Sequence, residues 1–407
     1  MTMNGIFDGL RVLDFTQVLA GPTATRLMVE MGAEVIKVEM QPAGDVSRAL
    51  PRIRDGRSGY HVQQNRGKKS LFIDLKDPRG RELVLDLIPE IDVLVQNFAA
   101  GVIERLGFGW ADVSPLNPSL VMASLSAFGR TGPLADQPGY DPVAQAYGGV
   151  LHMLGYEDRP PVQNGTSPGD VLTGVHGLAG ISAALFHRER TGEGQEISVS
   201  LLDAYVTTHE VNWQDWSVAN GEIDPIRKGS QHPVVGACGV FPVGSDGGNI
   251  VIAAVNDRQW AALCRVMGGP ELADDPAFDS NGRIENRDAT NRAILDWLAT
   301  ETDRDDVMAR LQAARVPAAP VLTIAEAANH PHLLENRTLR WVPDDVLGEV
   351  LVPGMPIKFS AFPDELPLMT RQLGADNEYV ARELARRSEA DYDALVGAGV
   401  LKHVERS

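Results

Sequence analysis

One aspartate stands where a carboxylate could act as a nucleophile. Asp170 lies in the segment GDVLTG, where a loop rich in glycine and proline gives way to an apolar helical pattern that runs to Arg190. An Asp directly before an apolar run is also a favoured N-cap, and the spacing alone favours the cap over the nucleophile. A helix N-terminus lowers the pKa of an Asp carboxyl, whereas a desolvated pocket would restore its reactivity.

Two other motifs suggest chemistry that their residues do not support. The segment GTSPG at residues 165–169 matches GxSxG, but Pro168 follows the serine and has no backbone N–H to serve as an oxyanion donor. The turn TQVLAGP at residues 16–22 has one glycine where a dinucleotide-binding GxGxxG needs three. Its Gly21-Pro22 pair opens a helix, so the turn either cradles a phosphate or is a plain βα connection.

Basic and polar groups follow several predicted strands. The run RGKK at residues 66–69 and then Lys76 stand out in an acidic chain, either as a solvated loop or as a docking site for phosphates. Lys76 and Asn97-Phe98 directly follow two strands, with Arg105 on the next helix. Ligands of open α/β sheets bind at the carboxyl ends of strands, so these groups could reach one crevice. The nine histidines form no HExxH motif, and we expect no metal site.

Strand-like runs alternate with helix-like runs through the first half of the chain, which predicts an α/β fold with a mostly parallel, Rossmann-like sheet. We expect strands at residues 11–15, 34–39, 70–75, 92–96, 120–125 and 195–200, and helices at 22–31, 77–88, 102–106, 141–151, 170–190 and 201–220. A smaller α+β unit follows, with strands at 239–243 and 249–254, a turn at 245–248, and helices at 257–266, 283–300 and 303–314. In the tail we expect strands at 350–352 and 357–359 and a helix at 378–387. The predicted domains are a large Rossmann-like domain (1–200), a helical linker (201–238), the small domain (239–322) and a return segment that packs on the large domain (323–407).

The composition of the chain limits the classes of partner that it can bind. The 407 residues carry 37 basic and 55 acidic side chains, a formal charge of −18, so we expect neither nucleic acid nor an anionic membrane as a partner. Cys238 and Cys264 form no CxxC motif, which argues against a zinc ribbon or a disulfide framework. The start of the chain lacks the pattern of a signal peptide, and the apolar stretch at residues 171–186 is typical of a buried helix. We therefore expect a cytoplasmic protein.

Taken together, the motifs resemble the class III (CaiB/BaiF) CoA-transferase family, in which formyl-CoA transferase is a familiar member. The resemblance rests on GIFDGLRVLDFTQVLAGPTATRLMVEMGAEVIKVE, NRGKKSLFIDLKDPRGRE, DVLVQNFAAGVIERLGFG, SAFGRTGPLADQPGYDPVAQA, GDVLTG, HRERTGEGQEISVSLLDA, DGGNIVIAAVNDRQW and DYDALVGAGVL. It covers nearly the whole chain. It implies an enzyme that moves coenzyme A from an acyl-CoA thioester to a free carboxylic acid, with no permanently bound cofactor.

The resemblance also assigns residues and an assembly. Asp170 falls on the catalytic aspartate, and the implied CoA-binding residues are Val18, Leu19, Ala20, Ile73, Leu75, Lys76, Asn97, Phe98, Arg105 and Tyr140. The family fold is an interlocked homodimer in which two chains link like rings, each with a large Rossmann-like domain and a smaller α+β domain, and the active site lies between subunits.

The chain departs from the family pattern at several places. Formyl-CoA transferase has charged CoA contacts at the places of Met40 and Pro138, so phosphate anchoring would fall to Lys37 or to the Lys68-Lys69 pair. No glycine-rich loop for a formyl site is evident, which argues for another acyl group. The related racemases have a histidine at the position of Tyr140, and a tyrosine is a poor base at neutral pH. Transfer is thus favoured over 2-methylacyl-CoA racemisation, and a CoA-binding protein without chemistry is the third alternative.

Overall fold

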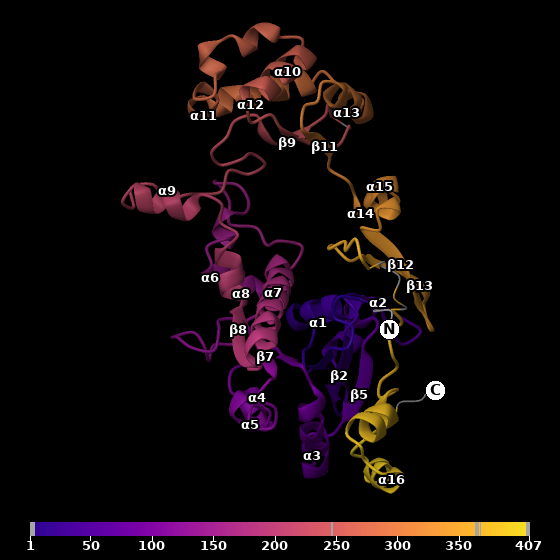
Figure 1. The fold of residues 1–407 in the computed structure, drawn as a ribbon. Coiled ribbons are helices and arrows are strands. Elements are labelled where there is room, and N and C mark those ends of the chain that lie inside the picture. The colour runs from indigo at the N-terminus through magenta and orange to yellow at the C-terminus, as the bar shows by residue number, and fades with distance from the viewer. Residues whose placement is uncertain (1–4, 246, 363–365, 367, 404–407) are drawn as a thin grey trace. The chain divides into compact units, whose positions relative to one another are not determined.

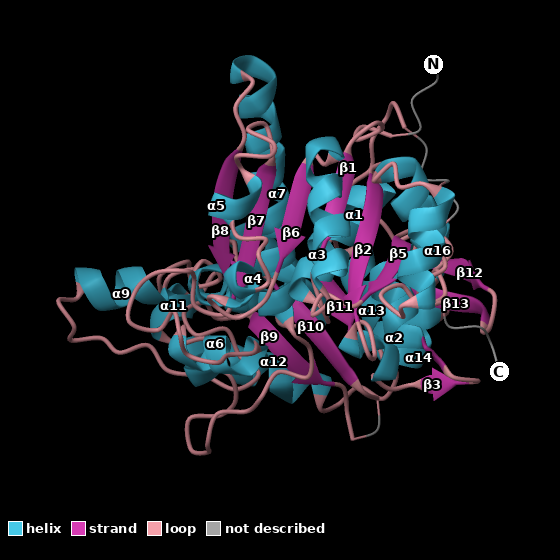
Figure 2. Cartoon of the chain, turned by 90° about the horizontal axis from the view of Figure 1, so that it is seen from below, coloured by secondary structure: helices cyan, strands magenta, loops and turns pink. Residues whose placement is uncertain are grey.

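The computed structural model describes residues 5–245, 247–362, 366 and 368–403. Its main feature is a six-stranded sheet in the order β5-β2-β1-β6-β7-β8, in which every neighbouring pair is parallel. The strands are β1 (Arg11–Asp14), β2 (Glu34–Met40), β5 (Lys69–Ile73), β6 (Val93–Gln96), β7 (Val121–Ser126) and β8 (Gln195–Ser200). All six lie where the sequence predicted strands, and the α/β fold class is confirmed (Figure 2).

Both faces of the sheet are buried. Successive side chains of a strand point to opposite faces, and each face packs in a hydrophobic core of its own. Val12 packs in one hydrophobic cluster and Leu13 in the other. Val93 and Leu94 divide in the same way. Helices α1 (Ala20–Glu30) and α7 (Pro168–Thr191) supply apolar residues to the first cluster, and α3 (Pro78–Leu87) supplies them to the second. Other helices of the same unit are α2 (Gly59–Asn65), α4 (Val102–Arg105), α5 (Trp110–Val113), α6 (Asp141–Tyr147), α8 (Leu201–Val206), α15 (Pro331–Glu335) and α16 (Glu389–Gly397).

Glycines let helix α7 approach its neighbours closely (Figure 1). A Cβ atom on Gly174 would lie 2.6 Å from the carbonyl oxygen of Ala20, and one on Gly177 would lie 3.2 Å from Leu125. The second turn of α7 is thereby held beside the first turn of α1. By length and composition α7 is apolar enough to cross a membrane, but a core helix passes the same test, and 44% of its most apolar stretch is buried.

A second group of elements has its own core. Strands β9 (Cys238–Pro242), β10 (Asn249–Ala253) and β11 (Ala318–Pro320) form an antiparallel sheet. Helices α10 (Asp257–Met267), α11 (Gly282–Glu285), α12 (Arg287–Leu298) and α13 (Arg304–Ala313) accompany it, and Trp260 is buried among them. The predicted strand pair is confirmed. Its predicted turn at 245–248 includes residue 246, which lies outside the described residues.

Two predicted elements are wrong. The long helix expected over residues 201–220 is broken into α8 and α9 (Asn212–Val218). The hydroxyls of Thr207 and Thr208 donate to the carbonyls of Ala204 and Tyr205, an alternative to helix hydrogen bonding that ends α8. The strand expected at 357–359 is absent: residues 356–357 form a bend, and the tail's hairpin is instead β12 (Leu339–Asp344) with β13 (Gly348–Pro353).

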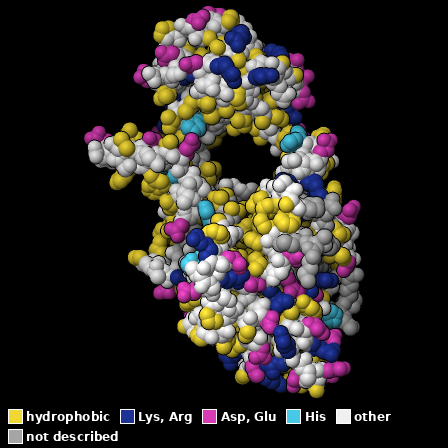
Figure 3. All heavy atoms as spheres, viewed as in Figure 1, with side chains coloured by type: hydrophobic (Ala, Val, Ile, Leu, Met, Phe, Trp, Pro, Cys, Tyr) yellow, Lys and Arg dark blue, Asp and Glu magenta, His cyan; other side chains and the backbone are white. Residues whose placement is uncertain are grey.

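Internal contacts divide the chain into two compact units. The larger unit comprises residues 1–148, 165–208 and 330–407, and the smaller comprises 149–164 and 209–329. These boundaries differ from the predicted domain ranges, which stay predictions. The tail nevertheless contacts the sheet within the larger unit, where Asn377 accepts a hydrogen bond from the backbone of Phe72 and Leu401 bridges to Ile73. On the face seen in Figure 3, acidic and basic side chains lie intermingled.

Candidate active site

Asp170 lies in the first turn of α7, but it does not cap the helix. The helix begins at Pro168 with Ser167 as its N-cap, so Asp170 is the third helical residue and the predicted cap role is wrong. Pro168 at the first position was the available signal, because proline is favoured there. The Asp170 side chain is half-buried, and its carboxylate has no ion-pair partner within the described part of the chain.

A second carboxylate lies beside Asp170. Asp141, the first residue of α6, is 5% exposed and accepts a hydrogen bond of 3.0 Å from the backbone N–H of Asp170. The hydroxyl of Tyr205 on α8 donates to the other oxygen of Asp141 at 2.6 Å. Gly169 makes room for this arrangement, since a Cβ there would lie 2.1 Å from the Tyr205 ring. Three helices therefore meet at one buried carboxylate.

Burial, and then the charge of Asp141, raises the pKa of Asp170 from 3.8 to about 7. Of the two opposing effects expected from the sequence, desolvation therefore outweighs the helix N-terminus. Tyr60 on α2 faces the same region: burial, and then the charges of Asp170 and Asp45, raise the pKa of its phenol to about 12. Asp170 is thus a desolvated, unusually basic carboxylate next to neutral phenols.

The start of α7 offers no free backbone donor at Val171, the residue after Asp170. Its N–H donates to the carbonyl of Ser167 at 3.4 Å as part of the helix.

The turn at residues 16–19, between β1 and α1, is strained and held from several sides. Val18 has a φ of 67°, which is unfavourable for a β-branched residue, and Leu19 is the N-cap of α1. The side chain of Asn97 clamps the backbone of Gln17, donating to its carbonyl and accepting from its N–H, both at 2.8 Å. Asp45 accepts from the backbone N–H of Val18 at 3.3 Å. Strain of this kind persists only where the surroundings enforce it.

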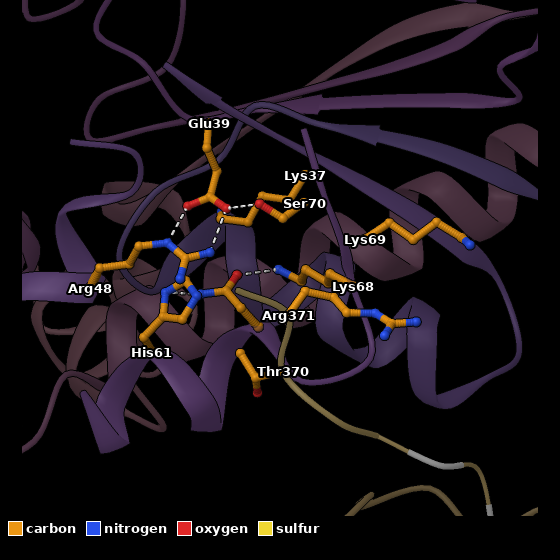
Figure 4. A pocket seen from close by; sticks show the side chains of 10 residues that line it. Lys37, Glu39, Arg48, His61, Lys68, Lys69, Ser70, Thr370 and Arg371 are labelled. Carbon is orange, nitrogen blue, oxygen red and sulfur yellow. Dashed lines mark hydrogen bonds and ion pairs between the residues drawn. The ribbon is translucent and has the colours of Figure 1, made fainter. Parts of the chain in front are cut away.

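Two lysines expected as phosphate anchors, Lys37 and Lys68, are instead buried and paired with carboxylates. Figure 4 shows both among the side chains that line a small pocket beside Glu39 and His61. Lys37 pairs with Asp45 at 2.8 Å and donates to the carbonyl of Thr16 at 2.6 Å. Lys68 pairs with Asp14 at 2.9 Å. Each lysine is 2% exposed and already paired with a carboxylate, which argues against the phosphate role expected for them.

The pKa values of the groups in this network depend on the charges of their neighbours. Burial alone would raise the pKa of Asp14, but the charges of Lys37 and Lys68 outweigh it and hold that pKa below its ordinary value. Burial lowers the pKa of Lys68 to about 8. Burial and the surrounding cations also lower the pKa of His61 well below its ordinary value. Lys69, at the edge of this cluster, is more exposed and lies over the ring of Tyr379.

The other predicted CoA-binding residues divide by exposure. Ile73 and Leu75 are buried in the hydrophobic core. Lys76 and Arg105 are exposed, and Tyr140, just before α6, is 78% exposed. Lys76 follows β5 and Asn97 follows β6, with two strands between them in the sheet, so these ends are roughly 14 Å apart. The structure thus places the turn at 16–19 and Asn97 together, with Lys76 farther along the same edge.

The roles of Asp141 and Tyr205 could not be predicted from the sequence. Asp141 is separated from Asp170 by 29 residues, and no spacing rule links them. In the sequence, nothing distinguishes Tyr205 from the other residues of the predicted helical segment LLDAYV. Within the described ranges, no group of three or more His, Cys, Asp or Glu side chains is arranged to hold a metal ion.

Known proteins resemble this chain over nearly its whole length. Residues 7–377 match CoA-transferase family III. A succinyl-CoA:mesaconate CoA-transferase of Haloarcula hispanica is 41% identical over 88% of this chain and 90% of its own length. An acetyl-CoA:oxalate CoA-transferase of Acetobacter aceti is 39% identical over the same shares. The crystal structure of a CAIB/BAIF family protein from Brucella suis superposes with a TM-score of 0.81 at 32% identity, covering 94% of this chain and 100% of that one.

Proposed function

The chain belongs to CoA-transferase family III and is an acyl-CoA:carboxylate CoA-transferase, and on that premise we propose that Asp170 carries coenzyme A covalently from donor to acceptor. The observation behind this proposal is the state of the Asp170 carboxylate, which is desolvated, has a pKa raised to about 7 and faces no cation among the described residues. A more basic carboxylate is a better nucleophile, and burial protects an anhydride from water.

The proposed reaction has four steps. The Asp170 carboxylate attacks the thioester carbonyl of the donor, the carbon–sulfur bond breaks, and the CoA thiolate leaves an aspartyl–acyl anhydride. The thiolate then attacks the aspartyl carbonyl, releasing the donor acid and forming an aspartyl-CoA thioester. The acceptor carboxylate attacks this thioester to form a second anhydride and free the thiolate again. Thiolate attack on the acceptor's acyl carbon releases the new acyl-CoA and regenerates Asp170.

We propose short dicarboxylates as acceptors and succinyl-CoA as a donor. Relatives are named for transfer from succinyl-CoA to mesaconate and from acetyl-CoA to oxalate, and a mouse relative, 31% identical over 98% of this chain, is named for succinyl-CoA and glutarate. Mesaconate, oxalate and glutarate all carry two carboxylates. In each case one carboxylate would react, and the other would be available for recognition by a cation.

Coenzyme A would contact the strained turn at Val18, Leu19 and Ala20, with the exposed cations Lys76 and Arg105 available to its phosphates. In this arrangement the Asn97 side chain holds the turn in shape through Gln17. We further propose that two chains interlock as a homodimer, as the family resemblance implies, and light scattering on the purified protein would test this by the mass in solution.

The direct test is a transfer assay with succinyl-CoA and each of the three dicarboxylates, comparing the wild type with Asp170→Asn. We expect the variant to lose transfer at least a thousandfold while it binds CoA as tightly as the wild type. Retained transfer in the variant would refute the assignment of Asp170. Deuterium uptake at Cα of a 2-methylacyl-CoA, with no acceptor present, would instead point to the racemase reaction.

A further inference from the structure

The carboxylate of Asp141 contacts the reacting residue without being placed to contact substrate itself. Both of its oxygens are occupied, one by the backbone N–H of Asp170 at 3.0 Å and the other by the hydroxyl of Tyr205 at 2.6 Å. Its side chain is buried, and it sits on a different helix from either partner. A charged group buried so fully, with all contacts to the protein, has a role in arranging its neighbours.

The first contact replaces a missing helix cap. The N–H of the third helical residue is the group that an N-cap side chain usually satisfies. In α7 the N-cap is Ser167, and its side chain makes no capping hydrogen bond. Asp141 accepts from the third residue, Asp170, in its place. The cap of α7 is therefore supplied by α6, and it acts on the backbone of the residue that carries the chemistry.

The second contact fixes Asp141. The phenol of Tyr205 is 1% exposed, and its ring rests against Gly169, where any side chain would collide with it. Gly169 therefore lets the ring pack directly against the backbone of α7. Tyr205 thus holds Asp141, and Asp141 holds the backbone of Asp170, so that rigid elements rather than loops orient the carboxylate.

The geometry points to Asp141 as the positioning residue of the transfer reaction: it anchors the first turn of α7 and keeps a negative charge beside Asp170, with Tyr205 as its support. This inference rests on the proposed role of Asp170 as the nucleophile. The groups facing Asp170 are Asp141 from α6, Tyr205 from α8 and Tyr60 from α2. Asp141 is the carboxylate among these three, and removing its charge makes the Asp170 carboxyl more acidic and less nucleophilic.

The test is the rate at which the full-length enzyme forms a covalent adduct with succinyl-CoA, measured in single turnovers from pH 5 to pH 9 and trapped with hydroxylamine. Asp141→Asn keeps the shape and removes the charge. We expect its adduct to form about 10- to 100-fold more slowly, and the acid limb of the pH profile to move down by about one pH unit. The dissociation constant for CoA should stay within about twofold, because the CoA site is intact.

Tyr205→Phe is the matched variant, because it removes one hydrogen bond but leaves the charge of Asp141. We expect a smaller loss of rate and an acid limb that does not move to lower pH. An Asp141→Asn enzyme with the wild-type rate and the wild-type limb would overturn the positioning role. If the wild type itself forms no adduct, the proposed function fails instead, so the two failures are distinguishable.

Discussion

Replacing Asp170 with Asn should make the protein more stable, and the gain should grow with pH. The folded state holds the Asp170 proton up to about pH 7, whereas the unfolded chain releases it near the ordinary value of 3.8. Between these values the folded state binds more protons than the unfolded state, so a rising pH destabilises the wild type. Asn carries no such proton, and the variant escapes this loss.

The magnitude follows from the pH window. Each pH unit in which only the folded state is protonated costs about 1.4 kcal/mol, so the interval from pH 5 to pH 7 gives about 3 kcal/mol. Because Asp170 is only half-buried, we reduce this to about 2 kcal/mol. For a unit of this size that is about 4 °C or more in melting temperature.

The assay is differential scanning calorimetry of ligand-free wild type and Asp170→Asn at pH 5 and pH 8. The melting temperature of the variant minus that of the wild type should be larger at pH 8. Asp136→Asn is the control, since it removes an exposed carboxylate of the same unit, and the change with pH for Asp170→Asn should exceed the change for this control. A difference for Asp170→Asn that stays constant or shrinks with pH would refute the raised basicity of this carboxylate.

Three further predictions concern the surroundings of the site. Asn97→Ala removes two hydrogen bonds that hold the strained turn at residues 16–19. Steady-state kinetics should show a KM for acyl-CoA about tenfold higher, with kcat within about twofold of the wild type. An unchanged KM would contradict the proposal that Asn97 holds the turn in shape for CoA. Lys68→Met leaves Asp14 charged and buried, and urea unfolding should show that the free energy of unfolding falls by about 3–5 kcal/mol. The control Lys69→Met should lower it by less than about 1 kcal/mol, and equal losses would contradict the buried pair. Gly174→Ala forces α1 and α7 apart, and thermal unfolding should show a loss of about 1–3 kcal/mol; an unchanged melting temperature contradicts the close approach.

The sheet could be predicted because its strands carry a strong local signal. Runs such as VLVQ at β6 and VMASLS at β7 are buried on both faces, and turn residues bound them. The break after α8 could not, because the apolar pattern continues through Thr207 and Thr208, whose hydroxyls end the helix by bonding to its carbonyls.

In the site, too, local features could be predicted from the sequence and contacts between distant residues could not. Asp170 could be singled out because its loop–helix position is visible in the sequence. Its environment could not, because the carboxylate that raises its pKa comes from residue 141 and the phenol that fixes that carboxylate from residue 205. Lys37 and Lys68 look like solvent-exposed cations in the sequence, and only the fold shows that each is buried against a carboxylate. Pairings between distant charges leave no mark in local spacing.

The central claim is that Asp170 becomes covalently acylated. The most direct measurement is to incubate the wild type with succinyl-CoA, add hydroxylamine, and map the modified peptide by mass spectrometry. We expect a hydroxamate on Asp170 that depends on the thioester and is absent from Asp170→Asn. A hydroxamate on another residue, or none while CoA transfer proceeds, would contradict it.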